Sequence, residues 1–212
     1  MMQHRGVNGM AIGGNSWSRF DEQEAESRLE VLEQAARIIH PDSPWFALRV
    51  MTGRELFVQE ALEVLGINSL VPMRKGKTWE RRGRKIEGVM QPVIFGYVLV
   101  QSDPSAIVLA AFKGVQDVIG ILGGALSPMR ITTSEINRFK VMADAGIYDW
   151  QKPGDIVVKA GERVRIADGP FDGMVAVVIT PNSKGRGDVV VAVGILGGEV
   201  PMTLPLAMLG KL

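Results

Sequence analysis

The sequence contains no cysteine and only two histidines, His4 and His40. Without cysteine the chain can form no disulfide, no thiolate metal site and no cysteine nucleophile, and a reducing compartment is the simplest setting. A zinc site or a histidine-based triad needs partners that these two histidines lack. We therefore expect no cofactor, no metal and no catalytic centre, although carboxylate or lysine chemistry stays open as an enzymatic alternative.

Long apolar runs are also missing. The most apolar stretch, residues 89–100, is interrupted by Gln91, Pro92 and Gly96 and is too short to cross a bilayer as a helix. The basic N-terminus is followed by glycines and polar residues instead of the apolar run of a signal peptide. We therefore expect a soluble, cytoplasmic protein. A hydrophobic content of 46% over 212 residues is ample for one large domain or two small ones.

Helical and strand patterns are interleaved in the first two thirds of the chain. Residues 1–19 are rich in glycine, asparagine and serine, which predicts a flexible tail, and residues 20–43 carry an amphipathic helix over 21–39. Residues 44–144 are expected to form an α/β or α+β sandwich. Its expected helices cover 55–65, 103–112 with Asp103 as cap, and 134–143 capped by Thr132 or Thr133, and its expected strands cover 45–51, 69–73, 89–101 and 118–122.

The pattern changes after Ala145. Residues 145–154 contain Pro153 and no helical periodicity, so we expect a linker there. Residues 155–212 consist of short valine-rich segments separated by turn signals, which predicts a small closed β-barrel. Its expected strands cover 163–167, 175–180, 189–193 and 200–204. The fold class is therefore α+β, with a mixed sandwich followed by a barrel.

Positive charge is concentrated in one short segment. Between residues 74 and 85, seven basic residues face one acid, which gives +6 and leaves −5 for the rest of a chain of net charge +1. Glycines flank an aromatic there, so we expect a hairpin tip or loop that contacts phosphates and stacks on a base. A solvated loop that only aids solubility is the alternative. The candidate nucleic-acid residues are Arg74, Lys75, Lys77, Trp79, Arg81, Arg82, Arg84 and Lys85.

Two further segments are candidate contact surfaces. Phe95, Tyr97 and Leu99 alternate along a strand and share one face, which is either ordinary core or an apolar surface left open for a partner helix. The turn at 168–174 has glycines and a proline that fix a loop on which Phe171 is displayed. We favour a protein contact for this loop over phosphate binding, because no helix follows its glycines.

Over residues 45–212 the sequence resembles the NusG family of transcription elongation factors. The first part is similar to the family's NGN domain in Trp45, TGRE at 52–55, VP at 71–72, FGYVLV at 95–100 and GILGG at 120–124. The second part is similar to its KOW domain in GERVRI at 161–166, DGPF at 168–171, ILG at 195–197 and PMTL at 201–204. The resemblance implies an NGN sandwich with an antiparallel sheet, followed by an SH3-like five-stranded barrel.

The resemblance also implies a mechanism. The NGN domain would bind the clamp region of RNA polymerase and favour processive, pause-resistant elongation or antitermination. The matching contact positions are Phe95, Tyr97, Leu99 and Arg49. The basic segment would lie near upstream or non-template DNA. The barrel would recruit a ribosomal protein or a termination factor, and the corresponding positions are Phe171, Met174 and Leu196.

Some positions depart from the family pattern. Met174 and Ala176 stand where a second phenylalanine and a glycine are usual, and the N-terminal extension is additional. With the basic insert, these features resemble a specialised, RfaH-type paralogue. A ribosome-associated RNA-binding protein is the alternative, because similar barrels occur in ribosomal proteins and the basic segment would suit ribosomal RNA equally well.

Overall fold

The computed structural model describes residues 16–150, 157–181, 187–195 and 198–212, with side chains from residue 21 onward. Residues 1–15 and 151–154, which belong to the expected tail and linker, lie outside the described residues. Helix α1 (Ser16–Ile38) begins earlier than expected, so residues 16–19 are helical and not part of a tail. No glycine or proline interrupts the sequence between residues 16 and 40, which removes the usual reason for a helix to stop there.

A four-stranded antiparallel sheet, here called the N-terminal sheet, forms the centre of the first part. Its strand order is β2–β7–β1–β8. The strands are β1 (Trp45–Val50), β2 (Ser69–Leu70), β7 (Tyr97–Gln101) and β8 (Val118–Ile121). β1 and β7 are the two inner strands and pair over five residues, from Trp45 opposite Gln101 to Arg49 opposite Tyr97. This arrangement confirms the antiparallel sheet of the expected sandwich.

Alternation along β1 divides its side chains between two cores. Phe46, Leu48 and Val50 point to a core shared with α1, α2 (Glu55–Val64), α3 (Ala106–Ala111) and the 3₁₀ helix η1 (Phe112–Gly114). Trp45 and Ala47 point to a second core shared with α4 (Thr133–Asp144) and the C-terminal strands. Both faces of the sheet are therefore covered, which explains why β1 reads as a nearly continuous apolar run.

Of the two N-terminal caps that the sequence predicts for α4 and α3, the first is confirmed and the second is wrong. Thr132 caps α4 as expected: its hydroxyl accepts a hydrogen bond from the Glu135 amide, while the Glu135 carboxylate accepts one from the Thr132 amide. The expected cap at Asp103 is wrong, because α3 begins at residue 106 after Ser105. Asp103 accepts a hydrogen bond from the Ser105 amide at 2.8 Å, a local turn that delays the helix.

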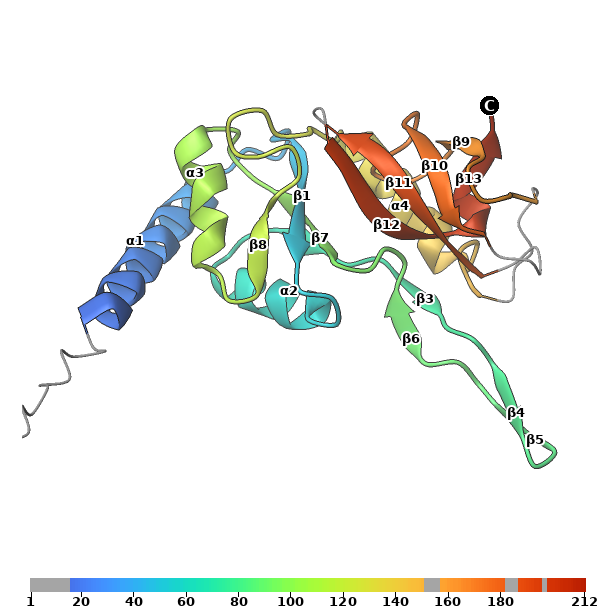
Figure 1. Ribbon diagram of the computed structural model, residues 1–212. Coiled ribbons are helices and arrows are strands. Elements are labelled where there is room, and N and C mark those ends of the chain that lie inside the picture. Colours follow the sequence, from blue (N-terminus) through green and yellow to red (C-terminus); the bar gives the residue numbers. More distant parts are fainter. Residues whose placement is uncertain (1–15, 151–156, 182–186, 196–197) are drawn as a thin grey trace, which may run out of the picture.

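Two expected strands are broken, and the breaks direct a long hairpin away from the sheet. Residues 69–73 divide at Pro72 into β2 and β3 (Met73–Lys75), and residues 89–101 divide into β6 (Met90–Pro92) and β7. Gly96, at φ +77°, sits in the second break, and its amide donates to the buried Glu55 carboxylate at 2.6 Å. The hairpin, here called the ribbon, runs from β3 through β4 (Trp79–Arg81) and β5 (Arg84–Ile86) to β6 (Figure 1).

The C-terminal strands form a five-stranded antiparallel sheet, here called the barrel, in the order β12–β11–β10–β9–β13. They are β9 (Arg163–Ile166), β10 (Val175–Thr180), β11 (Asp188–Ile195), β12 (Gly198–Pro205) and β13 (Leu209–Lys211), with the 3₁₀ helix η2 (Leu206–Met208) before the last. The five-stranded sheet is as expected, although β13 was not among the strands that periodicity predicted. Figure 1 shows the barrel beside β1 and β7, on the opposite side of the N-terminal sheet from α1.

None of the helices in the described ranges combines the length and the hydrophobicity that a membrane span requires.

Candidate functional site

Three of the four candidate polymerase-binding residues, Arg49, Tyr97 and Leu99, lie on one face of the N-terminal sheet, here called the Tyr97 face. Arg49 stands opposite Tyr97, and Ala47 stands opposite Leu99, so these side chains share a face. Tyr97 and Leu99 are buried, with exposed fractions of 7% and 3%, whereas Arg49 is exposed. Phe95 is half-buried in the break before β7. Arg49, Tyr97 and Leu99 are therefore neighbours, and of these three only Arg49 is exposed.

The barrel covers the Tyr97 face, so of the two alternatives that alternation left open, the structure shows these side chains packed in a core and not left open. The rings of Tyr97 and Phe171 meet edge to face, with centroids 5.7 Å apart and planes at 72°. Phe171, expected to be displayed, is fully buried. Met174 is half-buried beside the same core, and Leu196 lies outside the described residues. The Tyr97 face and the barrel loop belong to one chain, so each is present at a high effective concentration for the other. Sequence periodicity does not reveal such a contact between distant segments.

A buried ion pair ties the base of the ribbon to the barrel. The Arg74 guanidinium donates to Asp188 of β11 at 2.6 Å and to the Tyr148 carbonyl at 3.3 Å. Arg74 is 1% exposed, and its Nε has no hydrogen-bond partner among the described residues. Burial raises the pKa of the Asp188 carboxyl, and the Arg74 guanidinium opposes that shift. Arg74 is therefore a structural contact between the two parts and is not presented to nucleic acid as expected.

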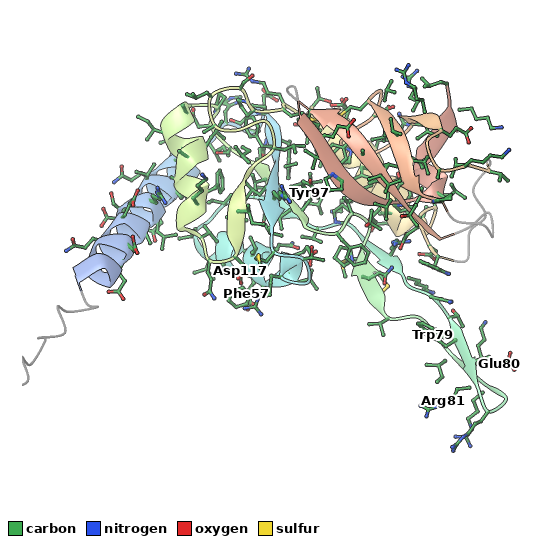
Figure 2. The ribbon with its side chains drawn as sticks, viewed as in Figure 1. Phe57, Trp79, Glu80, Arg81, Tyr97 and Asp117 are labelled. Carbon is green, nitrogen blue, oxygen red and sulfur yellow. The ribbon has the colours of Figure 1, made fainter. Side chains whose placement is uncertain are left out.

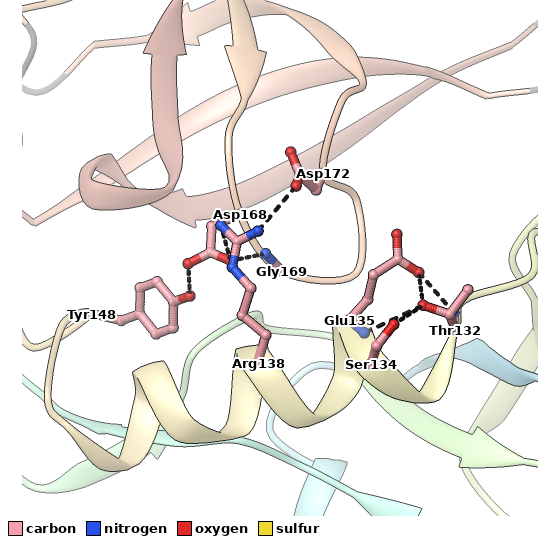
Figure 3. Close-up of polar contacts among 8 residues, drawn as sticks. All are labelled: Thr132, Ser134, Glu135, Arg138, Tyr148, Asp168, Gly169 and Asp172. Atoms are coloured by element: carbon pink, nitrogen blue, oxygen red, sulfur yellow. Dashed lines mark hydrogen bonds and ion pairs between the residues drawn. The ribbon is translucent and has the colours of Figure 1, made fainter.

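A second polar cluster fixes the loop that carries Phe171 (Figure 3). The Tyr148 hydroxyl donates to Asp168, and Arg138 of α4 lies 3.4 Å from Asp168 and 3.7 Å from Asp172. Burial and the hydrogen bond to Asp168 raise the pKa of Tyr148 well above its ordinary value. Asp168 also accepts from the Gly169 amide at 2.8 Å. Helix α4 and the segment after it therefore hold this barrel loop against the Tyr97 face.

Gly169 allows the barrel loop to pack this closely. It has φ +80°, and a side-chain carbon placed on it would fall 2.5 Å from the Met208 methyl carbon and 3.3 Å from the Phe139 ring. A larger residue would be strained by the positive φ and would require the Met208 methyl group to move and the Phe139 ring of α4 to shift slightly.

The remaining basic residues of the 74–85 segment lie on the exposed ribbon. Its end, here called the ribbon tip, is formed by β4, β5 and the two-residue turn Arg82–Gly83, in which both residues have positive φ. Figure 2 shows Trp79, Glu80 and Arg81 far from the body of the protein. The exposed candidate residues are Lys75, Lys77, Trp79, Arg81, Arg82, Arg84 and Lys85. The expected basic projection is thus present, without Arg74.

A groove of about 540 Å³ runs along the edge strand β8. Its charged lining residues are Arg28, Arg49 and Lys113, and the described lining includes no aspartate, glutamate or histidine. It therefore offers no acid–base pair of the kind that an enzymatic reading requires.

Sequence reasoning missed Arg138, Tyr148, Asp188 and Trp150, which take part in contacts around the ribbon base and the barrel. Each contacts a residue distant in the sequence, and no local motif marks such a pair. The expectation of a linker at 145–154 also led away from Tyr148 and Trp150, which lie within that range. Tyr148 is in fact 1% exposed.

The family model described as transcription termination factor nusG matches residues 43–140. A transcription termination/antitermination protein NusG from Pseudomonas aeruginosa is 30% identical over 184 residues, covering 79% of this chain and 97% of that protein. The protein of the same name from Deinococcus radiodurans is 27% identical over 191 residues, covering 79% and 98%. A solved structure on domain interaction in Thermotoga maritima NusG is 24% identical, covers 80% and 97%, and has a TM-score of 0.39.

Proposed function

Because the chain belongs to the NusG family, we propose that it is a transcription elongation factor that binds the clamp region of RNA polymerase and promotes processive elongation or antitermination. The observation that carries the proposal is the apolar Tyr97 face, at the positions that the family resemblance assigns to the polymerase contact. An aromatic anchor among aliphatic residues on a rigid sheet suits a protein hot spot.

The closed arrangement gives this proposal a structural condition. The barrel occupies the Tyr97 face, so polymerase binding requires the barrel to move away. Phe171 is buried in the same contact, so the barrel loop proposed to recruit a ribosomal protein or termination factor becomes accessible in the same step. The contact is partly polar, through the buried Arg74–Asp188 pair and the Arg138–Asp168 pair, which suits a separable interface better than a permanent core.

The ribbon tip supplies the proposed nucleic-acid contact. It projects from the N-terminal sheet, and its basic side chains are exposed on both strands. A protein bound to polymerase through the Tyr97 face would extend this tip toward upstream or non-template DNA. The contact is expected to depend on salt and to carry no sequence specificity by itself, because phosphates provide the attraction.

Binding of the full chain to core RNA polymerase, with and without an assembled elongation scaffold, tests the proposal. Tyr97→Leu and Phe171→Leu form a matched pair, because each removes one ring from the same ring contact while keeping an apolar side chain. Tyr97→Leu is expected to weaken polymerase binding about tenfold or more, since it removes the anchor itself. Phe171→Leu is expected to strengthen binding, since it loosens only the covering barrel.

Circular dichroism and thermal unfolding check that both variants fold. Equal weakening by the two substitutions would contradict a polymerase contact on the Tyr97 face. Absence of polymerase binding at low salt by both wild type and Phe171→Leu would refute the proposal. Retention of ribosomal RNA at high salt would then support the ribosome-associated alternative.

A further inference from the structure

Two tryptophans from distant parts of the sequence flank one lysine at the exposed ribbon. The Lys77 ammonium lies 4.7 Å from the ring centroid of Trp79 and 6.0 Å from that of Trp150. Trp79 belongs to β4 and is 59% exposed, and Trp150 follows α4 and is partly exposed. Because one ammonium group lies within 6.0 Å of both ring centroids, the two indoles belong to a single cluster.

Backbone hydrogen bonds fix the position of Trp150 beside the ribbon. Its amide donates to the Lys75 carbonyl at 3.0 Å, and the Lys75 amide donates to the Asp149 carboxylate at 2.8 Å. These reciprocal bonds attach the turn after α4 to the outer edge of β3, two residues before Lys77. The backbone of Trp150 is thus held beside the ribbon, whereas the Trp79 ring is exposed.

The charges around the cluster favour an anion on the tryptophan side of the ribbon tip. Trp79 pairs with Ile86 and Arg81 pairs with Arg84, so these four side chains share one face. Glu80, the sole acid of the 74–85 segment, pairs with Lys85 on the opposite face. The face with the tryptophan therefore combines an exposed ring with cations and has no carboxylate from that segment.

We propose that Trp79 and Trp150 form a stacking site for an unpaired nucleobase of single-stranded nucleic acid, with Lys77 contacting an adjacent phosphate. This inference rests on the proposed nucleic-acid contact of the ribbon tip and specifies its ligand. In the free protein the Lys77 ammonium lies against both rings, 4.7 Å from the Trp79 centroid and 6.0 Å from the Trp150 centroid. On binding, the base stacks on the indoles and the ammonium moves to the phosphate, so that one cation–π contact is exchanged for stacking and an ion pair.

The ligand must be single-stranded because a base inside a duplex has both faces covered by its neighbours. Stacking accepts any base, since every base has a π-face, so the site adds affinity without reading sequence. Single-stranded DNA and RNA share this chemistry, and a comparison of the two identifies which strand is the source.

Binding of the full chain to fluorescein-labelled oligo(dT), oligo(U) and a duplex of the same length, by fluorescence anisotropy at matched salt, tests the site. Trp150→Ala is expected to weaken binding of the preferred single strand by about 5- to 100-fold, with little change in salt dependence. Trp150→Phe should recover most of the affinity, because a ring is retained. Ile86→Ala is the matched control, since it shortens an exposed apolar side chain on the same face without removing a ring.

Three results would overturn the stacking site. If Trp150→Ala bound single strands with wild-type affinity, the stacking site would be refuted. The proposed ribbon contact would still stand if that affinity depended on salt and required Arg81 and Arg84. An equal loss for duplex and single strand would show that Trp150 does not act on unpaired bases. Failure of wild type to bind any oligonucleotide would refute both the stacking site and the ribbon contact, without touching the polymerase contact.

Discussion

The two ends of the ribbon contain the same kinds of residue and differ completely in their surroundings. At the base, Arg74 is buried and bonded to Asp188 of the barrel. At the tip, Arg81 and Arg84 stand directly opposite one another in solvent. Like charges that face each other across a strand pair destabilise it slightly, so the tip is not arranged for its own stability. A continuous basic segment can therefore contain a structural residue at one end and solvent-exposed cations at the other.

Breaking the buried pair at the base gives the largest expected effect. Arg74→Met leaves Asp188 partly buried without its guanidinium partner and is expected to lower the free energy of unfolding by about 3 kcal/mol. This is the low end for a broken buried pair, because the Asp188 side chain keeps 17% exposure. Equilibrium unfolding in urea measures the change.

Two further variants sharpen this test. Lys75→Met, at the exposed neighbouring position, should change the free energy of unfolding by less than about 0.5 kcal/mol. The double variant Arg74→Met with Asp188→Leu should recover part of the loss, since the partly buried carboxylate is removed together with the guanidinium. Equal effects at positions 74 and 75 would mean that the base and the tip do not differ as described.

Neutralising the tip is expected to alter binding and not stability. Replacing Arg81, Arg82 and Arg84 with glutamine should reduce the slope of log K against log salt for single-stranded DNA by about 2, at roughly 0.7 per lost phosphate contact. The free energy of unfolding should stay within about 0.5 kcal/mol of wild type. Anisotropy titrations between low and moderate salt provide the slope. An unchanged slope would place the phosphate contacts elsewhere.

The smallest expected effect is a pH dependence of the closed arrangement. Burial raises the pKa of Tyr97, and Arg49 opposes that shift. A phenol with a raised pKa favours the folded state fully below its ordinary value of about 10 and loses that contribution as pH rises beyond it. Barrel docking should therefore weaken only above about pH 10 through this group.

Ultraviolet absorbance of the phenolate measures this effect in Tyr148→Phe, in which Tyr97 is the only tyrosine left of two. The midpoint should lie above the ordinary value, and addition of Phe171→Leu should lower it by exposing the ring. A midpoint that is ordinary in both proteins would contradict coverage of Tyr97 by the barrel.

Local signals predicted the elements better than their surroundings. Residues of the Thr132–Glu135 capping box and the apolar segment at 45–50 determine their own structure through bonds and alternation within a few positions. The interruption at Gly96 was visible in the sequence, but the break at Pro72 was not expected. The ribbon that the two breaks direct outward was expected only as a loop or hairpin tip. Strand β13 spans three residues, which is too short for periodicity to detect.

The candidate site was predictable in its composition and not in its exposure. Alternation placed Tyr97 and Leu99 on one face, but alternation alone does not say whether that face meets solvent, a partner or another part of the same chain. Arg74 illustrates the same limit, because its partner Asp188 lies on a strand beyond the linker. The role of Trp150 was not predicted, because the composition of residues 145–154 is that of a linker. The structure shows instead a turn there that hydrogen bonds attach to the ribbon.

The ring contact between Tyr97 and Phe171 links the two proposed binding surfaces, the Tyr97 face and the barrel loop, thermodynamically. Any ligand of the Tyr97 face competes with a tethered domain, so its apparent dissociation constant is the intrinsic one divided by the open fraction. Each 1.4 kcal/mol by which the closed arrangement is favoured over the open one therefore weakens the binding of that ligand about tenfold. A molecule that binds the barrel loop increases the affinity of the Tyr97 face for its ligand. By reciprocity, a ligand of the Tyr97 face increases the affinity of the barrel loop for that molecule by the same factor. The protein would then respond most strongly when both ligands are present together, as a coincidence detector does.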